Sequence, residues 1–299
     1  MNVGFIGFGE AAFEMASGLK EEGLNGFKVF DLVWNHPVYG EIIRERIEIV
    51  DASLCEQPRE VLKSCDVVIV AVPADKAHKV SEMLYPDLKS HTLYIDVSAS
   101  TPQIKYDISL LVEKKQAMFV DAAMMGPLPI YKHKVPIFAS GSGTDHFINK
   151  FSPYHMNVTK IGNKGGDASA VKLVRSVFMK GLAQLLIETL GAAKHFDVEK
   201  LVVESINETM NNNSFEKMMN RLVTGTAIHS ERRGIELQGS IDMLTSGNLD
   251  ASMSKAAKVK LDKITELKLK EKFNGQVPDT WEEVIEVLNE TLGDSVVRQ

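Results

Sequence analysis

The sequence VGFIGFGEAA, residues 3–12, decides the fold of this chain. Four mainly apolar residues lead into Gly7, Gly9 and Ala12, which match the spacing G-x-G-x-x-A. In this pattern the first glycine permits a tight turn between strand and helix, and the second lets the backbone approach a bound pyrophosphate. The alanine lets helix and strand pack closely. The stretch therefore predicts a dinucleotide site that includes Gly7, Phe8, Gly9, Glu10, Ala11 and Ala12.

Two later segments add to the predicted cofactor site. Asp31 follows the predicted strand over residues 28–30. An acidic side chain at this place accepts hydrogen bonds from the ribose hydroxyls of NAD and repels the 2′-phosphate of NADP. Another strand, over residues 66–72, is stopped by proline, and we assign Val72 and Pro73 to the cofactor site. The sequence thus predicts NAD as the cofactor, with NADP as the alternative.

Up to Gly162 the chain alternates short β-branched runs with amphipathic helical patterns. The uninterrupted apolar run over residues 67–72 is typical of a parallel strand that is covered on both faces. Expected strands are 2–6, 28–30, 47–50, 66–72, 92–97, 117–121 and 135–139, and expected helices include 10–22, 74–84 and 101–115. This alternation predicts an α/β fold with a Rossmann domain, a doubly wound parallel sheet, over residues 1–163.

The second half of the chain has a different pattern. Strand signals end, and Gly165 and Gly166 precede a long helical stretch without proline over residues 167–196. Further helices are expected at 198–209, 214–224, 226–246, 252–270 and 279–292. We therefore expect an all-α domain over residues 164–299, joined to the Rossmann domain by the long interdomain helix.

The overall composition excludes several functional classes. The 299 residues carry a net charge of −6, which disfavours nucleic-acid binding because that requires a positive surface. Two cysteines are too few for a disulfide framework, and no Cys/His cluster has the spacing of a metal site. No apolar run approaches the roughly 20 residues that cross a bilayer, and no signal-peptide pattern is present. We expect a cytoplasmic protein without a membrane partner.

Five segments resemble the β-hydroxyacid dehydrogenase superfamily, which includes 3-hydroxyisobutyrate and 6-phosphogluconate dehydrogenases. GFIGFGEAAFEMASGL (4–19) resembles the family's opening, and IDVSASTP (95–102) resembles the segment that leads to a substrate-contacting serine. DAAMMGP (121–127) aligns with a substrate loop, and GGDASAVK (165–172) resembles the start of the helix that carries the catalytic lysine. HSERRGIE (229–236) is similar to the branch with a DUF1932 C-terminal domain.

This resemblance implies an NAD(P)-dependent, homodimeric oxidoreductase that transfers hydride between the nicotinamide and a small, anionic hydroxy acid or sugar acid. It implies Lys172 as the general acid/base, with Ser98 and Gly126 beside the substrate. Family members usually follow the lysine with asparagine, or with histidine and asparagine, where this chain has Arg175 and Ser176. We assign both to the substrate site, and their difference from the family means that no known member's substrate can be carried over.

The spacing of residues on the long helix supports a role for Lys172. Lys172, Arg175 and Ser176 are spaced i, i+3, i+4, so they share one helix face. A neighbouring cation lowers the pKa of an ammonium group, which allows a lysine to accept the hydroxyl proton of an alcohol. The alternative is an ordinary solvated lysine. A separate apolar stripe is expected to pack in the core: Val171, Val174, Phe178, Leu182 and Leu185.

A second polar helix face contains His229, Arg232, Arg233 and Glu236. Two guanidinium groups can bind a carboxylate or phosphate through paired hydrogen bonds, so we predict that Arg232 and Arg233 bind the substrate. The alternative is a solvated face with local Glu–Arg pairs, or an interdomain salt bridge.

Two other functions stay open. The same fold can serve oxidative decarboxylation or oxidation coupled to isomerisation of a sugar acid. A non-catalytic dinucleotide-binding sensor is the alternative from another class, with Arg175 and Ser176 marking lost chemistry. Imine reductases resemble this fold too, but they commonly lack the lysine, so Lys172 disfavours them.

Overall fold

A computed structural model describes the backbone of residues 1–297 and the side chains of residues 1–291. The chain forms two compact units, one up to Val177 and the other from Phe178 onward. The helix α8 (Asp167–His195) begins in the first unit and continues into the second. The predicted domain boundary, between residues 163 and 164, lies just before this helix. No helix in the described part of the chain is long and apolar enough to span a membrane.

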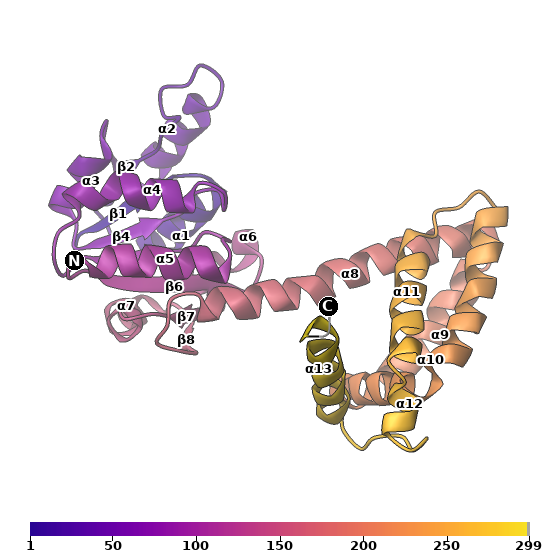
Figure 1. The fold of residues 1–299 in the computed structure, drawn as a ribbon. Helices are drawn as coiled ribbons and strands as arrows, with labels where there is room; N and C mark the ends of the chain where they lie inside the picture. Colours follow the sequence, from indigo (N-terminus) through magenta and orange to yellow (C-terminus); the bar gives the residue numbers. More distant parts are fainter. Residues whose placement is uncertain (298–299) are drawn as a thin grey trace. The chain divides into compact units, whose positions relative to one another are not determined.

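The first unit is built on one eight-stranded sheet (Figure 1). The strands are β1 (Val3–Ile6), β2 (Lys28–Phe30), β3 (Ser53–Leu54), β4 (Val67–Val70), β5 (Leu93–Asp96), β6 (Met118–Met124), β7 (Ile137–Ser140) and β8 (Val158–Lys160). Their order is β3-β2-β1-β4-β5-β6-β7-β8, and every neighbouring pair is parallel except β6 and β7. The first six strands have the order of the doubly wound dinucleotide-binding fold, which confirms the predicted fold class.

Helices cover both faces of this sheet. They are α1 (Glu10–Glu21), α2 (Gly40–Ile49), α3 (Pro58–Ser64), α4 (Ala77–Leu84), α5 (Pro102–Glu113), α6 (Leu128–Tyr131) and α7 (Thr144–Phe151). Alternate strand residues point to opposite faces: Phe5 and Ile69 pack in the core with α1, α2 and α7, whereas Ile6 and Val70 pack with α3, α4 and α5. Burial on both sides explains why β1 and β4 lack polar residues.

Some local predictions are wrong. The strand expected at residues 47–50 is instead the end of α2. Ile43 and Ile47, one helical turn apart, are both buried, whereas Ile49 is 62% exposed. Burial therefore follows the helical period at this place and not the alternation of a strand. The short strands β3 and β8 were not expected from the sequence.

The second unit contains α9 (Glu199–Asn211), α10 (Phe215–Ser246), α11 (Ser252–Glu266), α12 (Leu269–Lys272) and α13 (Trp281–Val297). Within the described residues from 178 to 297 it has no strand, as predicted. The two helices expected at 214–224 and 226–246 correspond to the two parts of α10, which meet at a kink at His229, where φ is −113° and ψ is 18°; the break lies four positions later than expected. Ala227, Leu269 and Val284 form a small core that joins α10, α12 and α13.

The apolar stripe expected on the long helix does not pack in the core, so this prediction is wrong. Val174 is 71% exposed, and Val171, Phe178 and Leu185 are exposed as well. The first turn of α8 is buried instead, since Ala168 is fully buried and Ser169 nearly so. The sheet holds this helix through its first turn and not through the stripe.

Candidate cofactor and substrate site

The predicted cofactor residues follow the carboxyl ends of three neighbouring strands. Gly7 follows β1, Asp31 follows β2, and Val72 and Pro73 follow β4. The strand β1 lies between β2 and β4. The strands that follow β1 in the chain are added first on one side of it and then on the other, so the order of strands reverses at this place. Doubly wound sheets bind their ligands at such a switch point, outside the carboxyl ends of the strands.

The two glycines of the turn meet different surroundings. Gly7 has φ of +83°, and a Cβ atom there would lie 2.5 Å from the carbonyl oxygen of Ala71 and 2.9 Å from Cγ1 of Val72. Only glycine fits this position. A Cβ atom at Gly9 would meet no protein atom within 4 Å, although Gly9 is the N-cap of α1. The open space at this helix N-terminus fits the pyrophosphate of a dinucleotide, which backbone N–H groups bind.

The Asp31 carboxylate accepts a hydrogen bond from the glycine turn. Its Oδ2 atom accepts the backbone N–H of Phe8 over 2.6 Å, and its Oδ1 atom accepts the N–H of Val33 over 2.9 Å. The Phe8 side chain is fully buried, so only the backbone of this residue is available to the loop. Each carboxylate oxygen can accept more than one hydrogen bond, so Asp31 retains capacity for ribose hydroxyls. Ala12 is buried at the start of α1, whereas Glu10 is exposed.

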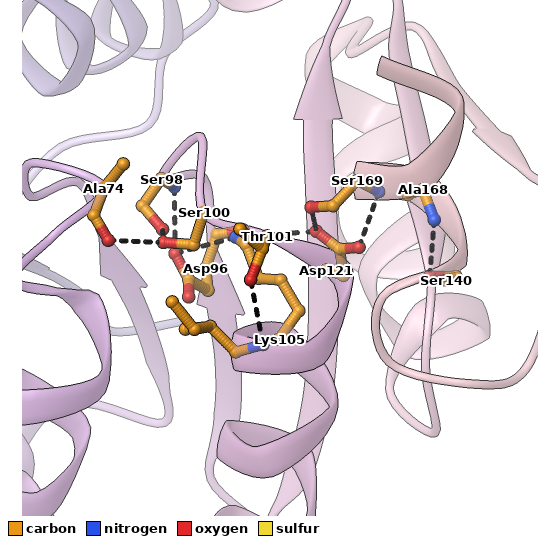
Figure 2. A network of polar contacts seen from close by, with 11 residues as sticks. Ala74, Asp96, Ser98, Ser100, Thr101, Lys105, Asp121, Ser140, Ala168 and Ser169 are labelled. Carbon is orange, nitrogen blue, oxygen red and sulfur yellow. Dashed lines mark hydrogen bonds and ion pairs between the residues drawn. The ribbon is translucent and has the colours of Figure 1, made fainter. Parts of the chain in front are cut away.

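Ser98 and Gly126, predicted beside the substrate, follow the carboxyl ends of β5 and β6. Ser98 is buried; its N–H donates to Oδ1 of Asp96 over 2.8 Å, and its hydroxyl lies 3.0 Å from that of Ser100 (Figure 2). A Cβ atom at Gly126 would lie 3.4 Å from Val135, in ordinary contact. The backbone at Gly126 is therefore close to the segment that leads into β7.

A fully buried ionic cluster lies under this edge of the sheet. Asp96 of β5 and Asp121 of β6 are paired in register, and Lys105 reaches them from α5 (Figure 2). The Lys105 Nζ atom lies 3.0 Å from Oδ1 of Asp96 and 3.4 Å from Oδ1 of Asp121, and it donates to the carbonyl of Asp96 over 2.9 Å. Oδ2 of Asp96 has no hydrogen-bond partner among the residues described.

The cluster also holds the first turn of α8. Ser169 donates both its N–H and its hydroxyl to Asp121, each over 2.8 Å (Figure 2). Gly166 has φ of +105°, and a Cβ atom there would lie 2.4 Å from the carbonyl oxygen of Pro102, so this glycine lets the start of α8 lie against α5. Lys172 follows Ser169 by three positions and is partly buried. Arg175 is exposed and Ser176 partly buried on the same half of the helix.

The two arginines of α10 have different surroundings. Nη1 of Arg233 donates to the carbonyl of Leu222 over 3.2 Å and to the hydroxyl of Thr226. Nε of Arg232 lies 3.6 Å from the Glu236 carboxylate, with both side chains largely exposed. Arg232 also lines a cavity of about 260 Å³, together with His229 and the charged side chains of Glu231, Lys268, Lys270 and Glu271. The two arginines therefore have different partners within the second unit.

The four residues of this cluster were missed by the sequence analysis, although the pattern of α5 indicated a buried lysine. The four are Lys105, Asp96, Asp121 and Ser169. The buried residues of α5 are Lys105, Ile108, Ser109 and Val112, which have the spacing of one helix face. A lysine in that stripe requires a buried partner. The acids of two neighbouring strands, Asp96 at the end of β5 and Asp121 in the middle of β6, are such partners.

The doubly wound sheet, the glycine turn at its switch point and the acid after β2 define an NAD-binding protein. Residues 2–149 match the family model of the NAD binding domain of 6-phosphogluconate dehydrogenase. Residues 193–264 match the model of a domain of unknown function, DUF1932. The two models together confirm the family and the branch that the sequence motifs indicated.

Three relatives illustrate the match. A conserved protein of unknown function, described as structurally similar to 3-hydroxyacid dehydrogenases, is 31% identical, with 92% of this chain and 100% of that chain covered and a TM-score of 0.59. Mitochondrial 3-hydroxyisobutyrate dehydrogenase of Drosophila melanogaster is 28% identical over 43% of this chain and 38% of its own length. An imine reductase of Streptomyces aurantiacus shares the fold at 14% identity, with a TM-score of 0.75 over 96% and 99% of the two chains.

This chain belongs to the 6-phosphogluconate dehydrogenase-like family whose members join the NAD-binding domain to a DUF1932 domain. The family model is named for a dehydrogenase, and the relative from Drosophila melanogaster is a dehydrogenase as well.

Proposed function

We propose that this protein oxidises a small hydroxy acid or sugar acid with NAD, using Lys172 as the general acid/base. The observation that carries the proposal is the attachment of α8 to the cofactor sheet. Ser169 bonds Asp121 in the middle of β6, and Lys172 follows one helical turn later. The backbone of Lys172 is therefore positioned by the sheet, because it lies one helical turn from a residue that β6 binds directly.

The turn at Gly7 and Gly9, together with Asp31, would hold NAD, which would supply the hydride acceptor for the alcohol carbon. The Lys172 amine accepts the hydroxyl proton as the C–H bond breaks, so the alcohol becomes a carbonyl compound and the lysine becomes an ammonium group. In the reverse direction the ammonium group returns this proton to the carbonyl oxygen. Arg175 lies three positions further along the same helix. Ser98 and Ser176 supply hydroxyl groups to the substrate, and Gly126 lets it approach the backbone.

We assign the anionic group of the substrate to Arg232 and Arg233. Arg232 lines a cavity whose cations include Lys268 and Lys270, an environment that attracts a carboxylate or phosphate. Arg233 bonds Leu222 and Thr226 through one terminal nitrogen, and its guanidinium group has five donors in all.

We further propose that the protein works as a homodimer. Ile187 on α8 and Leu201 on α9 are 65% and 67% exposed, and several other apolar side chains on these helices are exposed with them. Exposed apolar surface of this extent is typical of an interaction site. Light scattering behind a sizing column measures the mass directly, and a monomeric mass at micromolar concentration would rule the dimer out.

The decisive experiment is a turnover screen with hydroxy acids, sugar acids and cyclic imines, with NAD and NADP side by side, read at the absorbance of the reduced nicotinamide. We expect turnover of a hydroxy or sugar acid, and a loss of about 10²- to 10⁴-fold in kcat in Lys172→Met with an unchanged Kd for NAD. Lys180→Met, an exposed lysine on the same helix, is the control.

Three outcomes would change the proposal. If Lys172→Met keeps more than half of the wild-type kcat, Lys172 is not the acid/base. If carbon dioxide or an isomerised keto sugar acid accompanies oxidation, the reaction is a decarboxylation or an oxidation coupled to isomerisation. If NAD binds and no substrate is turned over, the protein is a dinucleotide sensor.

A further inference from the structure

The buried lysine of α5 connects the two halves of the proposed substrate site. We propose that Lys105 is a positioning residue that holds Ser98 and Lys172 in one fixed arrangement. The roles of Ser98 and Lys172 rest on the function proposed above. Lys105 itself is fully buried, so it acts through the residues that it contacts.

Two short chains of contacts lead outward from Lys105. On one side its ammonium group lies 3.0 Å from Oδ1 of Asp96, and the same oxygen accepts the N–H of Ser98 over 2.8 Å. On the other side it lies 3.4 Å from Oδ1 of Asp121, the atom that accepts the Ser169 hydroxyl over 2.8 Å. The Oδ1 atom of each acid therefore contacts both Lys105 and a serine, which is Ser98 at Asp96 and Ser169 at Asp121.

The stability of the fold does not account for this cluster. Two carboxylates and one ammonium group leave a formal charge of −1 away from water, and Oδ2 of Asp96 has no partner among the described side chains. Removing charges from water is costly, and well-packed apolar residues of similar volume often stabilise a protein as much or more. The neighbouring buried positions of α5, Ile108 and Val112, show that apolar packing suits this helix.

Hydrogen bonds and ion pairs depend on direction, so they fix the relative orientation of neighbouring elements more closely than apolar packing does. The contacts of Lys105, Asp96 and Asp121 hold α5 and the first turn of α8 against the paired strands β5 and β6, and they set how that turn is rotated. Ser98 is two positions from Asp96, and Lys172 is three positions from Ser169 within one helix, so a shift in the cluster moves both. A displacement of about 1 Å at reacting groups can cost roughly 10²-fold in rate.

The glycine turn and its acid are independent of this cluster. Gly7, Gly9 and Asp31 follow β1 and β2, and Asp31 bonds Phe8 and Val33. Disturbing Lys105 should therefore lower kcat and leave NAD affinity unchanged, a combination that a general loss of folding would not produce.

Three variants test the inference. Lys105→Met removes the ammonium group and leaves Asp96 and Asp121 facing each other, so we expect a loss of at least about 10-fold in kcat with a Kd for NAD within about twofold of wild type. Ser169→Ala removes one hydroxyl contact without leaving a buried charge, so it folds even if Lys105→Met does not. We expect Ser169→Ala to lower kcat, as Lys105→Met does. Ser169→Thr keeps the hydroxyl and should therefore retain most of the wild-type kcat.

Ser81→Ala is the matched control, because Ser81 is a buried serine that bonds the His78 carbonyl within α4. It should leave kcat unchanged. A lower melting temperature with unchanged kcat and KM in Lys105→Met and Ser169→Ala would overturn the inference and make the cluster purely structural. If Lys172→Met is inactive in that case, only this inference fails. If Lys172→Met stays active, the proposed function fails first.

Discussion

Ser169 donates both its backbone N–H and its hydroxyl to the carboxylate of Asp121, each over 2.8 Å, although the two residues are 48 positions apart. Two hydrogen bonds to one buried carboxylate fix the rotation of a helix turn as well as its position. The first turn of α8 thus takes its orientation from β6. Lys172, which follows within the same helix, takes its orientation from the sheet through this pair.

The two glycines of the turn should respond differently to alanine. Gly7→Ala places a Cβ atom 2.5 Å from the Ala71 carbonyl oxygen at a left-handed φ, which costs about 1–2 kcal/mol from the backbone alone, so the melting temperature should fall. Gly9→Ala meets no protein atom and has an extended backbone that alanine accepts, so the melting temperature should stay unchanged. The added methyl group fills the space of the pyrophosphate, and NAD affinity should fall by about 10-fold or more. Equal NAD affinity in Gly9→Ala and wild type would place the pyrophosphate elsewhere.

Asp31→Ala should narrow the preference for NAD over NADP. The carboxylate repels a 2′-phosphate, and its loss removes that penalty. The variant also leaves the N–H of Phe8 without its acceptor, so NAD itself should bind more weakly and the melting temperature should fall. Titration of both cofactors measures the ratio of the two dissociation constants, with Glu41→Ala, an exposed acid on α2, as the control. Tighter binding of NADP than of NAD to the wild type would contradict the predicted preference.

Alanine at Arg232 and alanine at Arg233 should differ in their effects on the melting temperature and on the KM for the substrate. Arg233→Ala loses its bonds to Leu222 and Thr226, so its melting temperature should fall. Arg232→Ala loses only an exposed pair with Glu236 and should melt near wild type. If Arg232 binds the substrate anion, its removal raises KM by about 10- to 150-fold, the equivalent of a charge-assisted hydrogen bond. Unchanged KM values in both variants would remove the arginines from the substrate site.

Acid should destabilise the fold through His133. This buried histidine lies against α1, with its Nε2 atom 3.9 Å from Oε1 of Glu22. Burial, and then the charge of Lys134, lower the pKa of His133 below its usual 6.5, against smaller opposing effects of a backbone hydrogen bond with Tyr154 and of the charges of Glu22 and Glu21. The unfolded chain then takes up a proton first as the pH falls, so stability is complete above about pH 6.5 and declines below it.

The test is the melting temperature of wild type and His133→Leu between about pH 7.5 and 5.5. The variant should lose less stability on acidification than the wild type does. His146→Gln, a change at an exposed histidine, should keep the wild-type dependence. Parallel curves for wild type and His133→Leu would assign the acid sensitivity to other groups.

Several features of this protein were predictable because their causes are local. The turn at Gly7 depends on a few consecutive residues, and the apolar run of β4 reports burial on both faces wherever the chain folds. The order of strands and helices then leads to the doubly wound sheet, and with it to the edge where Asp31, Val72 and Pro73 lie. The bounds of β2 and the start of α8 agree with the predicted ones.

Other predictions failed because their causes are not local. The stretch 47–50 has β-branched residues, yet Ile43 and Ile47 pack as a helix face against the core. Val174 belongs to an apolar stripe that the core does not cover. Periodicity describes which residues share a face, and only packing decides what that face meets.

By itself the sequence determined the sheet, the glycine turn and the family, because short-range spacing and hydrophobic pattern specify them. Only the tertiary structure decided that Lys105 joins Asp96 to Asp121 and that Ser169 holds α8 on the second of these acids. The physical reason is that a buried charge needs its partners within about 4 Å, and those partners come from strands and helices that folding alone brings together.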